Sequence, residues 1–394
     1  ARAAALAQEH WIKARAEKNF SLFQPSLERI FDLQRQVAAC FGRQASPYDP
    51  LLDQYEPGMK SAQVRQVFAD LRRELVPLVK AIAAKSETDD SVLRKDYDEQ
   101  KQWDFGLQVI KQFGYDLERG RVDKVPHPFC TTFSLGDVRI TTRVARNFLP
   151  SYLMGTMHEC GHALYEQGFA PELERTPLGG AASLGVHESQ SRMWENLVGR
   201  SRGFWKVWYP RLQAAFPENL GGADFEVFYR AINKVKPSFI RVEADEVTYN
   251  LHTMLRFEVE VDVLEGRLEV KDIPAVWNAR FKDYFGLDVP DDGQGCLQDV
   301  HWGIGYIGYF ATYTLGNIIS VQFWEQALKD APSIPGDIER GEYGSLLKWL
   351  REKIHRHGRK FMPVDLIKRV TGGPLDSRPY VAYLKRKYSE IYGL

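Results

Sequence analysis

The chain contains 394 residues, of which 44% are hydrophobic and 26% are charged, and this length can bury a large core. Its 52 Lys and Arg residues balance 52 Asp and Glu residues, so the charge does not support nucleic acid or an anionic membrane as a partner. No apolar run could span a bilayer, and residues 1–10 contain no signal-peptide apolar region. The cysteines form no Cys-x-x-Cys pair, which favours a reduced, cytoplasmic protein; they are Cys40, Cys130, Cys160 and Cys296.

Hydrophobic residues recur at helical spacing through the first part of the chain. Residues 1–45 predict helix, with a break near Ser21–Pro25. Val64–Ala84 predicts a clear amphipathic helix, and Pro77 within it predicts a local kink. Ser91–Phe113 predicts another helix, with its Lys, Asp and Glu residues on a solvated face.

The hydrophobic period then changes from helical spacing to alternation. Phe129–Phe133 and Asp137–Val144 are rich in β-branched residues, and Ser134–Gly136 joins them. This pattern predicts a β-hairpin and is the strongest strand signal in the chain.

Helical spacing returns after the hairpin and continues towards the C-terminus. Gly and Pro residues separate the predicted helices, which are 150–168, 183–201, 223–234, 237–266 and 272–285, with several more beyond them. The basic stretch Lys348–Lys360 alternates with Glu and apolar residues, so it predicts an amphipathic helix rather than a nucleic-acid site. Without internal repeats or low-complexity linkers, the sequence predicts one large, mainly α-helical domain over residues 1–394 with a small antiparallel sheet.

Two histidines in one predicted helix have the spacing of metal ligands. His158-Glu-Cys-Gly-His162 has the form H-E-x-x-H, with Pro150 suited to the helix start and Gly168 to its end. Because residues four apart share a helix face, both imidazoles can bind one ion, and Glu159 can reach a water bound to it. This arrangement is typical of a zinc peptidase, and the alternative is two histidines on an ordinary amphipathic helix.

A catalytic zinc ion needs a third protein ligand and an open position. Residues 183–196 predict a second helix, on which Glu188 is the natural third ligand and His187 the competing candidate. Glu166 is too close to His162 along the same helix to complete the coordination, and a structural role suits it better. A Glu on a following helix is the gluzincin arrangement, which favours Glu188.

These ligands imply a specific hydrolytic chemistry. Zinc would lower the pKa of its bound water and polarise the scissile carbonyl. Glu159 would take the water proton and pass it to the leaving amine. The oxyanion needs further donors, and His301, Tyr306 and Tyr309 in one aromatic stretch are candidates, although packing explains any single tyrosine equally simply.

An exopeptidase that acts at the C-terminus also needs a cation for the substrate carboxylate. Arginine serves best, because its planar guanidinium binds a carboxylate through two parallel hydrogen bonds. Arg139 in the hairpin and Arg241 in Ile240–Asp245 stand beside distinctive sequence. For either residue, an ordinary surface role remains the alternative.

The motifs together resemble one family, the thermostable Taq-type metallocarboxypeptidases. Its motifs D-x-R-x-T, H-E-x-x-H, H-E-S-Q, I-R-x-x-A-D and G-x-x-Q-D-x-H-W occur here in the family order. They match Asp137–Thr141, His158–His162, His187–Gln190, Ile240–Asp245 and Gly295–Trp302. Five motifs in register over residues 137 to 302 make the resemblance very specific.

The resemblance implies a helical fold with a deep active-site groove, related to angiotensin-converting enzyme and neurolysin, with the sheet beside the site. It also implies metal-dependent release of C-terminal residues from peptides with broad specificity, a zinc ion that cobalt or manganese can replace, and a homodimer. By matching position, the metal ligands would be His158, His162 and Glu188. By the same match Glu159 would be the base, and Arg139, Arg241 and the motif that contains Gln298 and His301 would line the groove. With Tyr306 and Tyr309 added from the aromatic stretch, the predicted catalytic residues are Glu159, His301 and Tyr309, and the predicted substrate-binding residues are Arg139, Arg241, Gln298 and Tyr306.

Family members usually carry further N-terminal helices and an early Trp-Asp motif before the region that residue 1 matches. The resemblance therefore implies a single catalytic domain that lacks these extreme N-terminal helices. Two alternatives to a carboxypeptidase remain: an oligopeptidase or endopeptidase on the same scaffold, and a metal-binding scaffold without catalysis. The presence of Glu159 argues against a scaffold, because simple metal binding has no use for a base.

Overall fold

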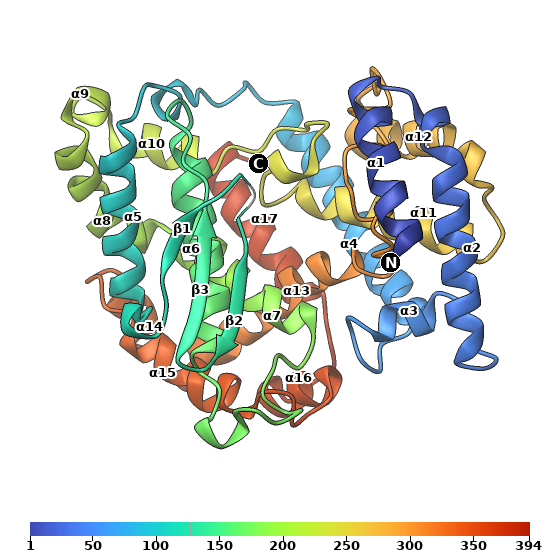
Figure 1. Ribbon diagram of the computed structural model, residues 1–394. Helices are drawn as coiled ribbons and strands as arrows, with labels where there is room; N and C mark the ends of the chain where they lie inside the picture. Colours follow the sequence, from blue (N-terminus) through green and yellow to red (C-terminus); the bar gives the residue numbers. More distant parts are fainter. Residues whose placement is uncertain (127) are drawn as a thin grey trace. The chain divides into compact units, whose positions relative to one another are not determined.

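The computed structural model describes residues 1–126 and 128–394, and most of them are helical (Figure 1). The chain forms two compact units, each built from separate stretches of sequence. Unit 1 contains Ala1–Ser86, Val235–Thr314 and Val381–Leu394, whereas unit 2 contains Glu87–Lys234 and Leu315–Tyr380. Among the described helices, none has both the length and the apolar composition needed to cross a membrane.

Unit 1 is entirely helical in its regular structure. Its helices are α1 (Arg2–Ala16), α2 (Gln24–Cys40), α3 (Asp49–Asp53), α4 (Ser61–Ala83), α11 (Tyr249–Leu264) and α12 (Ile273–Phe285). It also contains the start of α13 (Ala311–Asp330) and most of α17 (Arg378–Tyr392). Helix α11 is buried almost throughout, because α2, α4 and α12 pack around it.

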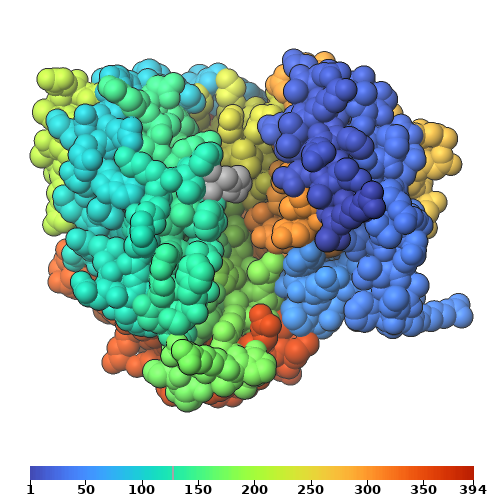
Figure 2. Space-filling model, viewed as in Figure 1, coloured from blue at the N-terminus to red at the C-terminus, as the bar shows by residue number. Residues whose placement is uncertain are grey.

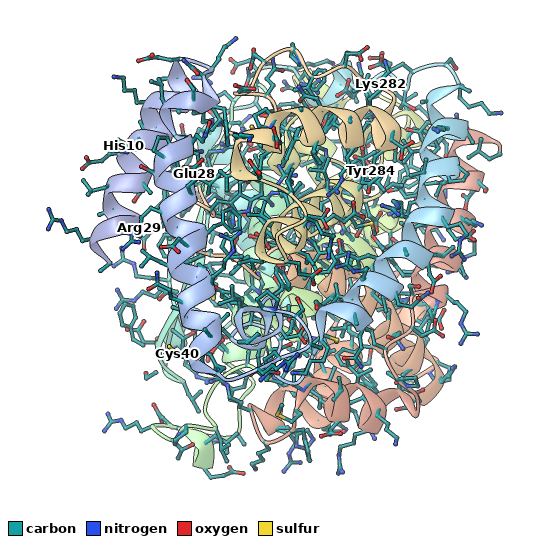
Figure 3. All side chains as sticks on the ribbon, turned by 90° about the vertical axis from the view of Figure 1, so that its right-hand side faces the viewer. His10, Glu28, Arg29, Cys40, Lys282 and Tyr284 are labelled. Carbon is teal, nitrogen blue, oxygen red and sulfur yellow. The ribbon has the colours of Figure 1, made fainter. Side chains whose placement is uncertain are left out.

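Polar side chains join the helices of unit 1 at its surface. Tyr284 on α12, labelled in Figure 3, donates a hydrogen bond to Glu258 on α11 at 2.5 Å. Arg72 on α4 reaches the other oxygen of that carboxylate at 2.6 Å. Cys40, at the end of α2 in the same view, is exposed and not in a disulfide.

Unit 2 carries the sheet and the helices around it. Its helices are α5 (Glu99–Phe113), α6 (Leu149–Glu166), α7 (Leu184–Arg192), α8 (Arg202–Ala215), α9 (Pro217–Leu220), α10 (Phe225–Ile232), α14 (Ile334–Ile338), α15 (Gly344–Lys353) and α16 (Pro363–Thr371). A π-helix, Met193–Val198, directly follows α7. Aromatic side chains fill the core behind it, where Trp208 Nε1 donates to Tyr343 Oη at 2.9 Å.

The sheet has three strands, β1 (Val122–Lys124), β2 (Cys130–Ser134) and β3 (Asp137–Thr142), in the order β1-β3-β2. Strands β2 and β3 are antiparallel, which confirms the predicted hairpin, but β1 pairs with β3 in parallel. The sheet is therefore mixed rather than purely antiparallel. The hairpin lies at the surface of unit 2, where Phe133 is 69% exposed (Figure 2).

The mainly α-helical class is confirmed, but some predicted helix bounds are wrong. Residues 91–113 contain a 3-10 turn, Ser91–Leu93, before α5 begins at Glu99. The predicted helix 237–266 begins only at Tyr249. Just before it, the Asp245 side chain accepts the backbone N–H groups of residues 247 and 248 and holds this segment in a turn. Helix α8 lies outside the predicted segments and contains Pro210.

Candidate metal centre

Helix α6 presents His158 and His162 on one face. Their ring centroids are 4.9 Å apart, as the four-residue spacing predicts. Pro150 lies in the first turn of α6, where its missing N–H costs no hydrogen bond. Thr156 on the same helix shares a 2.8 Å hydrogen bond with Thr142 of β3, which attaches the sheet to α6. The two histidines therefore project from a helix that its neighbours hold rigidly.

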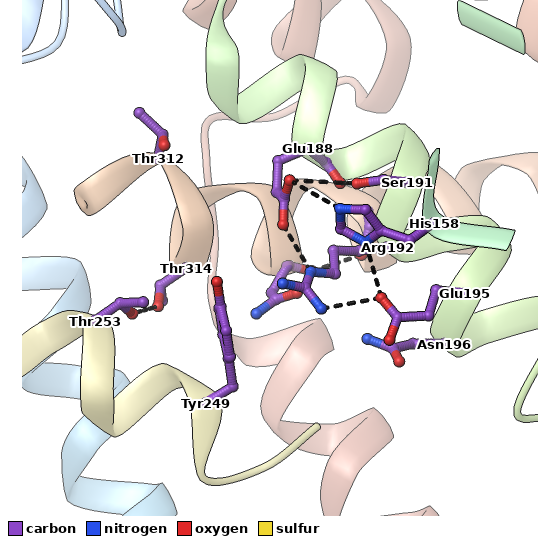
Figure 4. Close-up of polar contacts among 12 residues, drawn as sticks. His158, Glu188, Ser191, Arg192, Glu195, Asn196, Tyr249, Thr253, Thr312 and Thr314 are labelled. Carbon is purple, nitrogen blue, oxygen red and sulfur yellow. Dashed lines mark hydrogen bonds and ion pairs between the residues drawn. The ribbon is translucent and has the colours of Figure 1, made fainter. Parts of the chain in front are cut away.

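Helix α7 brings Glu188 to the two histidines, and Figure 4 shows Glu188 beside His158. Its N-terminus is capped by Ser183, whose hydroxyl accepts the N–H of Val186 at 3.0 Å. Glu188 Oε2 lies 3.5 Å from His162 Nε2 and 3.7 Å from His158 Nε2. Ligand atoms around a tetrahedral ion with bonds of about 2.0–2.1 Å are roughly 3.3 Å apart. The three side chains therefore fit a divalent metal ion with little adjustment, and all their ligand atoms lie within 4.8 Å of one another.

Two glycines allow the helices to approach closely enough for this geometry. A Cβ on Gly161 of α6 would lie 2.6 Å from the carbonyl oxygen of Gln190 and 2.6 Å from Ser191 Cα. A Cβ on Gly316 of α13 would lie 2.6 Å from Glu188 Cβ. Real Cβ contacts are almost never below 3.0 Å, so only glycine permits these approaches. Gly161, between the histidines in H-E-x-x-H, thus sets the distance from α6 to Glu188.

The carboxylates of the site have different protonation tendencies. Burial alone would raise the pKa of Glu188, but Arg192 and the two histidines lower it below its usual value. Burial raises the pKa of Glu159 to about 7, and His158 opposes that rise. Glu188 is therefore ionised and ready to bind a cation, whereas Glu159 can exchange a proton near neutral pH.

His187 and Glu166, the other ligand candidates, bind each other instead. His187 Nε2 lies 2.8 Å from Glu166 Oε1, and its ring stacks on His162 with centroids 4.4 Å apart. His187 therefore supports the ring of His162 from the side, while Glu188 faces both histidines.

Arg139 lies on β3 of the same unit. Its guanidinium forms two hydrogen bonds to Asp137, each 2.7 Å long, and lies over the Phe133 ring. Asp137 therefore already binds the edge of the Arg139 guanidinium that was predicted to bind a substrate carboxylate.

The remaining predicted site residues belong to unit 1. Arg241, in a 3-10 turn before α11, is buried and binds Asp299 through Nη2 at 2.7 Å. Arg256 of α11 binds the second oxygen of Asp299 at 2.5 Å. Burial would raise the pKa of Asp299, but the two guanidinium groups hold it well below its usual range. Arg241 is thus one of two buried cations that share one carboxylate.

Gln298, His301, Tyr306 and Tyr309 lie on the segment between α12 and α13. Gln298 Oε1 accepts the backbone N–H of Arg241 at 2.8 Å, which joins the two motifs. The rings of Tyr306 and Tyr309 stack with centroids 5.8 Å apart, and His301 lies 5.5 Å from Tyr309. Within unit 1, the structure therefore pairs Gln298 with Arg241 and brings His301, Tyr306 and Tyr309 into one aromatic cluster.

Two polar residues at the metal centre received no role from the sequence. Glu195 accepts from His158 Nδ1 at 2.9 Å, and Arg192 lies between Glu188 and Glu195. A signal was present, because residues four and seven positions after Glu188 share its helix face.

Comparisons with known proteins show the family of this chain. Residues 1–388 match the family model described as carboxypeptidase Taq (M32) metallopeptidase. Carboxypeptidase 1 of Bacillus subtilis is 42% identical, with 98% of this chain and 77% of the relative covered. Thermostable carboxypeptidase 1 of Thermus thermophilus is 43% identical, with 100% of this chain and 79% of the relative covered.

Solved structures agree as well. The M32 carboxypeptidase from Deinococcus radiodurans is 45% identical with a TM-score of 0.98, over 100% of this chain and 79% of that one. The Pyrococcus furiosus carboxypeptidase is 38% identical with a TM-score of 0.95, over 98% and 78% of the two chains. The chain therefore belongs to the carboxypeptidase Taq (M32) family of metallopeptidases and is a metallocarboxypeptidase.

Proposed function

We propose that this metallocarboxypeptidase is zinc-dependent and removes C-terminal residues from peptides with broad specificity. The observation that carries the proposal is the cluster of His158, His162 and Glu188, with Glu159 buried beside it. Two imidazoles and one carboxylate are the donor set of many catalytic zinc sites, and cobalt or manganese can also occupy such a set.

Glu159 acts as the general base and then as the general acid. A bound ion would supply Lewis acidity, lowering the pKa of a coordinated water and polarising the scissile carbonyl. The Glu159 carboxylate accepts the proton of the attacking water and then donates it to the nitrogen of the leaving amine. Its pKa of about 7, raised by burial, suits both transfers, although a nearby cation would favour the ionised form.

The roles proposed for the remaining residues rest on the family motifs for Arg139, Arg241, Gln298 and His301, and on the aromatic stretch for Tyr306 and Tyr309. We assign His301 and Tyr309 to stabilisation of the oxyanion, and Gln298 and Tyr306 to substrate binding. Arg241 and Arg139 are assigned to the substrate carboxylate. Because Arg241 and Arg139 are already paired with Asp299 and Asp137, a substrate carboxylate would have to share or displace these partners.

A pair of peptides tests the exopeptidase assignment. Purified protein loaded with zinc is incubated with one peptide sequence carrying either a free or an amidated C-terminus, and the products are followed by mass spectrometry. We expect stepwise loss of residues from the free peptide and at least a 100-fold slower reaction of the amidated one. Comparable internal cleavage of both would identify an oligopeptidase on the same scaffold.

Substitution of the base tests the catalytic assignment. Glu159→Gln should bind metal and lower kcat by a factor of about 10² to 10⁴, the usual contribution of general acid–base catalysis. Glu172→Gln, at a side chain that is 63% exposed, should retain full activity as the matched control. Metal analysis of the native protein identifies the ion, and an unchanged kcat in Glu159→Gln would remove Glu159 from the mechanism.

We also propose a cytoplasmic homodimer that acts on peptides with free C-termini. The reduced state of four scattered cysteines supports the location, and the family resemblance supports the dimer. Sedimentation equilibrium at micromolar concentration tests the dimer, because a 45.2 kDa species would show a monomer.

A further inference from the structure

Arg192, the last residue of α7, lies between two carboxylates at the metal centre (Figure 4). Its Nε donates to Glu188 Oε1 at 2.7 Å, and its Nη1 donates to Glu195 Oε2 at 3.0 Å. Only 13% of its side chain is exposed. A single, nearly buried guanidinium therefore connects Glu188, a predicted metal ligand, to Glu195, which is not one.

Glu195 connects this arginine to the first histidine. Its Oε2 accepts from both Arg192 and His158 Nδ1, and its Oε1 lies 3.5 Å from Arg200 Nη2. Glu195 lies in the π-helix Met193–Val198, and Arg200 follows in the turn after it.

These contacts decide which ligand atoms face the metal position. Arg192 occupies Glu188 Oε1, so Oε2 is the oxygen that faces both histidines. Ser191 Oγ also lies 3.3 Å from Oε2, but it donates at 2.7 Å to the carbonyl oxygen of Glu188. A charged acceptor at His158 Nδ1 places the ring proton there and leaves Nε2 as the metal donor.

The second histidine differs from the first. His162 Nδ1 is buried and has no hydrogen-bond partner among the residues that the structure describes. Its ring is held instead by stacking on His187. Within the described site, His158 is therefore the imidazole whose orientation depends on a carboxylate, and Glu188 is the ligand whose orientation depends on a cation.

We propose that Arg192 and Glu195 form a positioning pair that sets the affinity and geometry of the metal site. Arg192 makes Glu188 a ligand through one oxygen, and Glu195 keeps His158 in the tautomer that donates through Nε2. Neither residue touches the substrate in this proposal. The inference rests on the proposed metal site and deepens it, because it names the residues that prepare the ligands.

Metal affinity, rather than activity, tests the pair. The full-length protein is stripped with a chelator, and zinc binding is measured by competition with a chromophoric chelator. Arg192→Met keeps the length of the side chain without its hydrogen bonds, and Glu195→Gln keeps the shape of the acceptor without its charge. We expect each to weaken zinc binding by about 10- to 100-fold, as for other residues that orient metal ligands.

Two further measurements separate positioning from general damage. The double variant should lose less affinity than the product of the two single losses, because both act through one network. The cobalt-loaded Arg192→Met variant should have a weaker visible absorption band, because Glu188 is then free to bind through both oxygens and raise the coordination number. Arg202→Met, which breaks a surface pair with Glu226, should change neither quantity.

Each outcome decides the proposal. Folded variants that bind zinc within threefold of the unmodified protein, with the same cobalt spectrum, would overturn the positioning pair. If Arg192→Met does not fold, the isosteric Glu195→Gln variant alone decides in the same way. An unmodified protein that binds no metal would overturn the proposed function itself, and that result is distinguishable because it appears before any substitution.

Discussion

Replacement of Gly161 by alanine perturbs the metal centre without changing any ligand. The added Cβ would lie 2.6 Å from the Gln190 carbonyl oxygen and from Ser191 Cα, whereas ordinary contact begins at 3.4 Å. Both obstacles are backbone atoms of α7, so no side chain can rotate away. Helices α6 and α7 must therefore separate locally by the difference, about 0.8 Å.

This separation should affect metal affinity more than folding. Overpacking typically costs about 1–3 kcal/mol, and the better helix propensity of alanine returns up to about 1 kcal/mol. The expected net loss of stability without metal is therefore about 0–3 kcal/mol. Glu188 moves with α7 away from His158 and His162, and a metal site tolerates ligand displacements of only about 0.2 Å. We expect zinc affinity to fall by roughly 10- to 100-fold.

The same helix provides a matched control. Gly155 lies two turns before Gly161 on α6, and a Cβ there would meet no atom within 4 Å. Gly155→Ala should therefore stabilise the protein by up to about 1 kcal/mol and leave zinc affinity unchanged. Chelator competition measures the affinity, and thermal unfolding in excess chelator measures the stability. If the two alanine variants bind zinc equally well, the close approach of α6 and α7 is not the reason for a glycine at position 161.

Three further predictions concern metal, packing and pH. Chelation should lower the Tm, because zinc at 100 times its Kd adds about 2.7 kcal/mol to the free energy of unfolding. Gly316→Ala should displace Glu188, whose Cβ would lie 2.6 Å from the new atom, and raise the Kd for zinc in the same competition assay. Burial lowers the pKa of His355 to about 3, so the unfolded chain binds the extra proton as the pH falls below about 6.5. The stability that neutral His355 contributes is therefore present above pH 6.5 and lost below it, by about 2 kcal/mol at pH 5. Urea titrations at pH 7.5 and 5 measure the free energy of unfolding. Between these two pH values, His355→Gln should lose less of it than the unmodified protein. Equal losses in the two proteins would exclude His355 as the source.

Local sequence patterns were sufficient for much of the fold. The four-residue spacing of His158 and His162 predicted a shared helix face, and α6 confirms it. Alternation of β-branched residues predicted the hairpin, which β2 and β3 form. The parallel partner β1 was not predicted, because Val122–Lys124 is too short to show a period and pairs with residues 18 positions further along the chain.

Motifs predicted the metal ligands, but distances between elements did not follow from them. Glu188 was preferred over His187 from the sequence, and the structure brings Glu188 to both histidines while His187 binds Glu166. The roles predicted for residues of unit 1 stay predictions. For these residues, the structure adds the side chains that they already contact, such as Asp299, which forms an ion pair with Arg241.

The sequence by itself determined the chemistry that is possible: two imidazoles on one helix face, a carboxylate beside them and a second carboxylate on the next helix. These follow from spacing along the chain, because helical geometry is local. Only the tertiary structure decided that Glu188 turns one oxygen towards both histidines, and that Arg192 contacts Glu188 while Glu195 contacts His158. That result depends on how closely α6, α7 and α13 approach one another. Glycines permit the close approach, but no local sequence pattern encodes the distance between the helices.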